Sequence, residues 1–180
     1  MRNDNPVLDL PAVPLKNVTN GQSWMMQQGN NVVYIAKLKG SAYEMGYAFG
    51  QLYGHEIQKN MENMLEYGKT KIEEIGEKFG IPDVTSDTVW EDIEPVLFEL
   101  LDLNYEIAEP YIPQRFVDEL QGIADGSNNL VNHTLLRRIN MLPELIQAAC
   151  SIVGSYGEAS VDGKLYHLRA LDWEPTAQVN

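Results

Sequence analysis

The sequence predicts an α+β fold, and three observations carry that prediction. Apolar residues recur at helical spacing over most of residues 41–149. The pattern changes at Cys150 to short, strand-like segments on either side of Asp162-Gly163, which is a tight-turn signal. Hydrophobic residues make up 44% of the 180, which is enough for a packed core. We therefore expect a mainly helical region followed by a β-hairpin.

The first 40 residues are expected to form an extended arm that ends in a strand. Residues 1–30 are rich in Asn, Pro and Gln, and Pro6, Pro11 and Pro14 are closely spaced. This composition favours an extended segment that lies on a larger body or is partly loose. Asn31–Leu38 has a β-branched centre and predicts a strand.

Ser41 begins the clearest helix of the sequence. Ser41 and Glu44 form a capping box, in which each side chain can bind the other residue's backbone N–H group. Apolar residues then recur mostly three or four apart until about Gly80, as on one face of a helix. The same helix carries three glycines at intervals of four residues, Gly46, Gly50 and Gly54. Because glycine weakens a helix, we expect another element to approach closely at this face.

Three further helices are predicted before the hairpin. They are Trp90–Tyr105 with Pro95 near its first turn, Gln114–Ala124, and Leu135–Ala149 capped by Asn132–Thr134 and interrupted at Pro143. After them, Cys150–Ser155 and Lys164–Trp173 are expected to pair as strands, the second of them buried on both faces. The predicted organisation is an arm and strand over residues 1–40, a helical region over 41–149 and a β region over 150–180.

Charge and composition exclude several functional classes. The chain has 26 acidic and 13 basic residues, so its net charge is −13. That charge argues against nucleic-acid binding and disfavours electrostatic docking to anionic membranes. We expect no integral membrane segment, since no apolar run approaches the roughly 18 residues of a span, and the first ten residues do not resemble a secretory signal. We also expect no cofactor and no metal, because the three histidines lie far apart and show no metal-ligand spacing.

Cys150 is the single cysteine and the first candidate for chemistry. It follows two alanines and opens a predicted strand whose partner strand brings Arg169 and Asp172 to the same hairpin. A nearby cation favours the thiolate, and a carboxylate can orient an amine or an imidazole base. A lone cysteine is also often a small buried hydrophobic residue, so from these residues alone both interpretations stay open.

The segments around Cys150 resemble those of a known family. Cys150-Ser151-Ile152-Val153 and, further on, Tyr166-His167-Leu168-Arg169-Ala170-Leu171-Asp172-Trp173 are similar to the start of the mature subunit in N-terminal-nucleophile cysteine amidohydrolases. The acid-ceramidase-like group, which is related to isopenicillin N acyltransferase-type peptidases, is the closest in pattern. Its Arg-Asn-Leu-Asp segment has Ala170 in place of Asn here, and Leu168 stands where Gly is usual.

Two upstream segments extend the resemblance over most of residues 40–173. Gly40-Ser41-Ala42-Tyr43-Glu44-Met45-Gly46-Tyr47-Ala48-Phe49-Gly50 is similar to the Gly-rich first helix of the family. Leu142-Pro143-Glu144-Leu145 is similar to the segment that precedes the nucleophile in the acid-ceramidase-like branch. The fold that this resemblance implies is a helical pro-region, or α-subunit, together with the first β-hairpin of an αββα sandwich.

The resemblance also implies an activity and roles for individual residues. The precursor would cut itself between Ala149 and Cys150, which frees the Cys150 α-amine as a general base with a pKa of about 7.7–8.0. The thiolate would attack an N-acyl amide, such as a ceramide-like or fatty-acid amide lipid, and form a thioester. Arg169 would hold the substrate or the developing oxyanion, and Asp172 would orient the α-amine. A purely structural Arg169–Asp172 pair is the alternative.

The position of the expected cleavage site predicts that this chain is a fragment. Cleavage would leave 31 residues from Cys150 onward, which suffice for one hairpin and not for a sandwich. The further catalytic Asn and second Arg of the family would follow Asn180. We therefore expect the chain alone to be inactive and its partners to be the substrate and a C-terminal β-subunit. A short, inactive relative is the alternative.

The resemblance further predicts a lysosomal or secreted protein. Asn17-Val18-Thr19 and Asn132-His133-Thr134 are candidate glycosylation sequons, although such triplets also arise by chance. The same residues leave other functions open. An acyltransferase or a phospholipase-B-like hydrolase on this fold would use the same thioester, and a non-catalytic helical interaction protein would use Cys150 only for packing.

Overall fold

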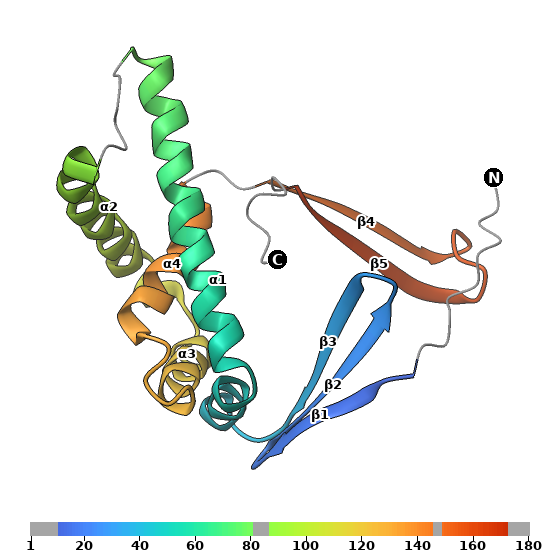
Figure 1. Ribbon diagram of the computed structural model, residues 1–180. Helices are drawn as coiled ribbons and strands as arrows, with labels where there is room; N and C mark the ends of the chain where they lie inside the picture. The colour runs from blue at the N-terminus through green and yellow to red at the C-terminus, as the bar shows by residue number, and fades with distance from the viewer. Residues whose placement is uncertain (1–10, 81–86, 146–148, 173–180) are drawn as a thin grey trace. The chain divides into compact units, whose positions relative to one another are not determined.

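The computed structural model confirms a mixed α+β architecture and describes residues 11–80, 87–145 and 149–172 (Figure 1). In chain order the elements are β1 (Val13–Val18), β2 (Gly21–Gln28), β3 (Asn31–Leu38), α1 (Ala42–Lys78), α2 (Asp87–Ala108), a 3₁₀ turn (Glu109–Tyr111), α3 (Gln114–Gly126), α4 (His133–Leu145), β4 (Ala149–Gly157) and β5 (Gly163–Asp172). Strands β1, β2 and β3 form one antiparallel sheet in that order, and β4 pairs with β5 in a second.

The three-stranded sheet corrects the predicted arm. Residues 31–38 form a strand as predicted, but the segment before them is not a loose arm, because it supplies β1 and β2. Each strand connection is a two-residue turn, and positive φ angles occur at Asn20 (65°) and Gly29 (59°). Asn and Gly adopt this backbone conformation at low cost, and Asn20-Gly21 was the sequence signal for the first hairpin. Residues 1–10 of the predicted arm lie outside the described part.

Helix α1 begins at the predicted capping box. The Glu44 carboxylate accepts hydrogen bonds from the Ser41 backbone N–H at 2.7 Å and from the Ser41 hydroxyl at 2.9 Å, and the Glu44 N–H donates to that hydroxyl at 3.3 Å. The backbone N–H of Ser41 is the main cause that lowers the pKa of Glu44. Reciprocal bonds of this kind satisfy N–H groups that lack partners at the start of a helix.

A kink at Tyr53 interrupts α1 and is held from two strands of the sheet. Tyr53 has φ −132° and ψ 22°, which are not helical angles. The Lys16 ammonium of β1 donates to the Leu52 carbonyl at 2.8 Å, and the Tyr53 hydroxyl donates to the Ile35 carbonyl of β3 at 3.2 Å. The lysine therefore satisfies a backbone carbonyl at the kink, where the regular helical pattern is broken.

The glycines of α1 contact the backbone of α3, which confirms the predicted close approach of another element to this face. A Cβ atom added at Gly46 or Gly50 would overlap a backbone carbonyl of α3, and one added at Gly122 or Gly126 of α3 would overlap a carbonyl of α1. Gly54 has looser surroundings, with its nearest neighbours at 3.3 Å. The two helices approach so closely because neither has a side chain at the crossing.

The apolar stripe of α1 contributes to the core of the described structure. Leu52, Met61 and Met64 are among its buried members, whereas Phe79 at its end is exposed. Other buried side chains come from α2, α3 and α4, including Leu101, Ile123 and Leu142. These side chains remove apolar surface from water, which is the main stabilising contribution to such a fold.

Helices α2, α3 and α4 occur where predicted, with three differences. Helix α2 starts before Trp90, so Pro95 lies well inside the helix and not in its first turn. Helix α3 continues through Gly126, two residues past its predicted end. Helix α4 ends at Leu145, four residues before its predicted end at Ala149, and Ala149 is the first residue of β4. The Asn132 side-chain oxygen accepts the Leu135 N–H at 3.0 Å and caps α4 as expected.

The predicted hairpin is present, but its described part is not buried on both faces. Ile152 and Val153 are adjacent in β4, so their side chains lie on opposite faces, and they are 65% and 61% exposed. Leu165 and Leu168 of β5 also lie on opposite faces, and they are 71% and 65% exposed. In the described part of this hairpin, apolar side chains thus face outward on both sides.

The chain forms two compact units, divided after Gln58, Pro110 and Leu136. The first contains the three-stranded sheet, the start of α1 and α3, and the second contains the rest of α1, α2, most of α4 and the β4–β5 hairpin. Both α1 and α4 contribute residues to each unit, and the division of the chain at residues 40 and 149 stays a prediction. None of the described helices is long and apolar enough to cross a membrane.

We predict that Gly50→Ala destabilises the protein by at least about 2 kcal/mol, because the new Cβ would overlap the Ile123 carbonyl and force α1 and α3 apart. Urea unfolding followed by circular dichroism measures this loss. Gly68→Ala is the matched control, since the nearest atom to its Cβ, in Leu142, is 3.8 Å away and alanine favours the helix. Equal stability of the two variants would contradict the backbone contact.

Candidate functional site

The backbone of the β4–β5 hairpin brings the predicted site positions together. Cys150 pairs with Leu171, and Ala149 pairs with Asp172. Arg169 pairs with Ile152, one register step of two residues from Cys150. Four sequence-predicted positions that are up to 23 residues apart in the sequence are therefore neighbours in one antiparallel ladder.

The register separates these positions into two sets. Alternate residues of a strand share a face, and directly paired residues of an antiparallel ladder share it too. The positions of Cys150 and Arg169 thus belong to one set, and those of Ala149 and Asp172 belong to the other. The side chains at 149–151 and 169–172 lie outside the described part, so the catalytic roles assigned to Cys150, Arg169 and Asp172, and cleavage after Ala149, remain predictions.

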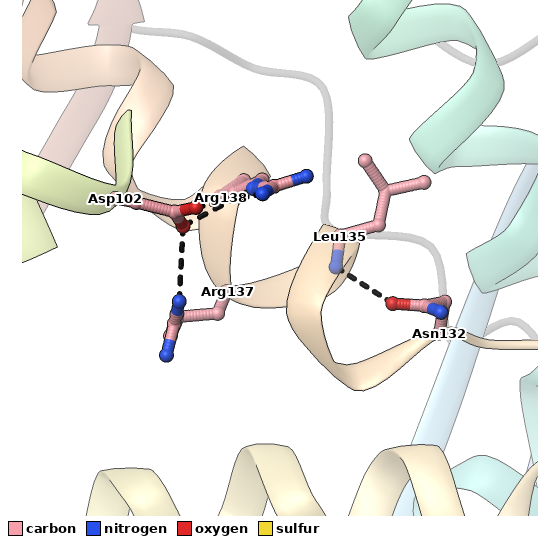
Figure 2. Close-up of polar contacts among 5 residues, drawn as sticks. All are labelled: Asp102, Asn132, Leu135, Arg137 and Arg138. Carbon is pink, nitrogen blue, oxygen red and sulfur yellow. Dashed lines mark hydrogen bonds and ion pairs between the residues drawn. The ribbon is translucent and has the colours of Figure 1, made fainter. Parts of the chain in front are cut away.

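The hairpin follows a helix that is anchored by a carboxylate with two guanidinium partners (Figure 2). Asp102 of α2 accepts two hydrogen bonds from Arg138 of α4, at 3.1 Å from Nε and 2.6 Å from Nη2, and a third from Arg137 Nη2 at 2.9 Å. The Asp102 side chain is 29% exposed, so water screens these bonds only in part. The bidentate pair between Arg138 and Asp102 is among the stronger kinds of charge-assisted hydrogen bonding.

Aromatic rings complete the surroundings of both arginines. The Arg137 guanidinium lies 4.3 Å from the Tyr105 ring centre, and the Arg138 guanidinium lies 4.4 Å from that of Phe98. Such stacking adds a cation–π attraction. The Arg138 hydrogen bonds are the main cause that lowers the pKa of Asp102, and Asp102 in turn raises the pKa of Arg138. The cluster fixes α4 against α2, and α4 ends five residues before Cys150.

Sequence reasoning missed this cluster. Its acid and its two bases are 35 and 36 residues apart and belong to different helices, so no local spacing connects them. The adjacent pair Arg137-Arg138, in a chain with few basic residues, was the one available signal. In the described part of the chain, no group of three or more His, Cys, Asp or Glu side chains is placed to hold a metal ion.

Both predicted glycosylation sequons lie at the surface. Asn17 is exposed near the end of β1, and Asn132 is exposed at the start of α4. The two differ in that the Asn132 side-chain oxygen already caps α4 through Leu135. Their modification remains a prediction.

The chain is similar to two proteins of Dictyostelium discoideum. It is 33% identical to Protein dcd1B over 171 residues, which cover 93% of this chain and 33% of that protein. It is 33% identical to Protein dcd1A over 173 residues, which cover 95% of this chain and 38% of that protein. The chain thus spans between a third and two fifths of the length of these curated relatives.

A shorter match links the chain to an archaeal protein. An uncharacterized protein of Archaeoglobus fulgidus is 34% identical over 102 residues, which cover 55% of this chain and 14% of that protein. No protein-family model matches the sequence, and no solved structure matches it.

We predict that Asp102→Asn destabilises the protein by about 1–3 kcal/mol at neutral pH, because it removes a charge-assisted anchor between α2 and α4. The pKa of Asp102 is lowered in the folded state, so its stabilising effect is full above the ordinary value of 3.8 and is lost as pH falls through the lowered pKa. The stability difference from the unmodified chain should therefore shrink in strong acid.

Urea unfolding at a series of pH values measures this difference. Asp118→Asn is the control, since the Asp118 carboxylate accepts its hydrogen bond from the neutral amide of Gln114. A loss of stability for Asp102→Asn that does not change with pH would contradict the ionic anchor.

Proposed function

We propose that this chain carries the nucleophile of a self-processing cysteine N-terminal-nucleophile amidohydrolase that hydrolyses N-acyl lipid amides, ceramide-like or fatty-acid amides. The observation that carries the proposal is the antiparallel register at the helix-to-sheet change. It sets Ala149-Cys150 against the segment that contains Arg169 and Asp172, and these are the positions on which the sequence resemblance rests. The acyltransferase and phospholipase-B-like alternatives would use the same residues.

The first step is self-cleavage. The Cys150 sulfur attacks the carbonyl carbon of Ala149, the peptide C–N bond breaks, and the released nitrogen takes a proton. Water then hydrolyses the thioester to an Ala149 carboxylate and a free thiol. Cys150 is left with a thiol and an α-amine on the same residue, so nucleophile and base need no separate histidine.

The second reaction uses that α-amine as the base. It takes the thiol proton while sulfur attacks the substrate amide carbon, and it returns the proton to the leaving amine as the C–N bond breaks. Water hydrolyses the acyl thioester and releases the fatty acid. A guanidinium at Arg169 would stabilise the oxyanion of each tetrahedral intermediate, and a carboxylate at Asp172 would keep the α-amine oriented.

The exposed hairpin supports a larger sheet as the setting for this chemistry. Two strands alone are marginal in water, and the described apolar side chains of β4 and β5 are exposed on both faces. We propose that in the longer relatives the sequence outside the match supplies strands that cover this hairpin, as in the αββα sandwich. A lysosomal or secreted location belongs to the same proposal.

We predict that the chain, co-expressed with the part of Protein dcd1A outside the match, is cut between Ala149 and Cys150 at mildly acidic pH. Intact-mass spectrometry should then find a 149-residue fragment and a new chain that starts at Cys150. Cys150→Ala should abolish the cut, and Ser151→Ala, which keeps the thiol, should retain it. A chain that stays intact regardless of Cys150 would favour the interaction-protein alternative.

We predict that Arg169→Ala abolishes hydrolysis of a fluorogenic fatty-acid amide by the same complex and leaves self-cleavage measurable. The loss should reach about 100-fold or more in kcat, because an oxyanion donor is removed. Arg169→Lys keeps the charge and should restore part of the activity. Hydrolysis at an unchanged rate in Arg169→Ala would contradict the role assigned to this residue.

A further inference from the structure

The β1–β2–β3 sheet is cationic, although the chain as a whole is acidic. Residues 10–43 contain no acidic residue and carry three lysines, Lys16, Lys37 and Lys39, although the whole chain has a net charge of −13. This stretch includes β1, β2 and β3. Salt screens exposed charges beyond a Debye length of about 8–10 Å. The net negative charge of the whole chain therefore does not set the attraction between this sheet and an anionic membrane, which depends on the charges nearby.

One face of this sheet, which we call the outer face, lies away from α1. The other face is covered near Gly21, where an added Cβ would be 2.9 Å from that of Ala48, and at Ser23, which is 1% exposed. Alternation along β2 and its register with β3 place the remaining positions on the outer face: Gln22, Trp24 and Met26 of β2, opposite Lys37, Ile35 and Val33 of β3.

The outer face has an apolar half and a polar half. Val33 is 58% and Ile35 is 37% exposed, and they pair with Met26 and Trp24. Toward the β1–β2 turn lies an open groove of about 470 Å³. Its lining residues are Asn17, Val18, Thr19, Asn20, Gly21, Gln22, Lys37 and Lys39.

The groove offers hydrogen-bond donors and no carboxylate. Two ammonium groups, three side-chain amides and one hydroxyl line it, and all can donate to an anionic oxygen. A phosphate group fits this chemistry, because lysine binds phosphate as a point charge. The apolar half beside the groove suits the boundary between head groups and acyl chains, where Trp is enriched.

The lysines favour a lipid surface over a protein core as the neighbour of this face. Burying Lys37 and Lys39 in a core would leave two ammonium groups without acidic partners, at a high cost in desolvation. At a membrane the same side chains stay hydrated, and each contributes roughly 1 kcal/mol of attraction to anionic lipid.

We propose that the outer face of the β1–β2–β3 sheet docks on an anionic phospholipid surface, with a lipid phosphate in the groove beside Lys37 and Lys39 and with Trp24, Met26, Val33 and Ile35 at the acyl boundary. This docking adds to the proposed lipid-amide hydrolysis and does not depend on it, since no residue of the groove belongs to the β4–β5 hairpin. A glycan on Asn17 would cover the groove, so the test uses protein made in bacteria.

The test is co-sedimentation of the full 180-residue chain with vesicles of phosphatidylcholine alone or mixed with phosphatidylserine at roughly 3:1. We expect binding to the mixed vesicles that weakens with added salt. Lys37→Glu with Lys39→Glu should weaken it at least tenfold, since each lysine accounts for about fivefold. The control is Lys78→Glu with Lys164→Glu, which makes the same charge change in α1 and β5, outside β1, β2 and β3, and should preserve binding.

A second measurement reports on the apolar half. In a Trp90→Phe, Trp173→Phe variant the fluorescence of Trp24 should move to shorter wavelength on mixed vesicles, and Val33→Thr with Ile35→Thr should reduce the shift. Equal binding to neutral vesicles, equal loss in the two lysine variants, or an unmoved Trp24 spectrum would each overturn the proposal. Glycerol 3-phosphate is added as a soluble competitor of vesicle binding. If it binds the chain as tightly as the mixed vesicles do, the groove is assigned to a soluble phosphate instead.

Discussion

The close backbone contact between α1 and α3 is the constraint on which the first compact unit depends. Glycines on both helices let each backbone reach carbonyl groups of the other, and no residue with a Cβ could replace Gly46, Gly50, Gly122 or Gly126 without moving a helix. Glycine costs about 1 kcal/mol in a helix relative to alanine, so this contact has to offset a substantial local penalty. On the side of the sheet, Gly21 leaves room for the Ala48 and Leu52 side chains of α1. Lys16 and Tyr53 hold the kink that follows.

The second unit is organised by charge and aromatic stacking as well as by apolar burial. Asp102 holds two arginines, and each guanidinium lies over a ring of α2. Because α2 is rich in Glu and Asp, the neighbouring cations of α4 also reduce repulsion along that helix. The anchored helix α4 ends five residues before Cys150, the candidate nucleophile.

The helices and the strands of this chain differ in how much of their apolar surface is buried. Helices of each unit contribute buried apolar side chains, Leu52 and Ile123 in the first and Met64 and Leu101 in the second. The described hairpin side chains and the outer face of the sheet leave apolar residues in water, and they differ in charge. The outer face carries unpaired lysines that suit a hydrated, anionic neighbour, whereas the two apolar faces of the hairpin suit further strands. The chain matches a third of one Dictyostelium relative and 38% of the other.

The sequence by itself determined the elements whose signals are local. The Ser41–Glu44 capping box, the Asn132 cap, the strand at residues 31–38 and the change from helix to hairpin at Cys150 all follow from neighbours within a few residues, and the structure contains each of them. The glycine spacing indicated a close contact and could not identify α3 as the partner. The first two strands were missed because proline and asparagine content outweighed the Asn20-Gly21 turn signal. Only the tertiary structure decided the pairing of Asp102 with Arg137 and Arg138, the register that sets Cys150 opposite Leu171, and the cationic outer face. The spacing of residues along the sequence does not show which distant positions meet.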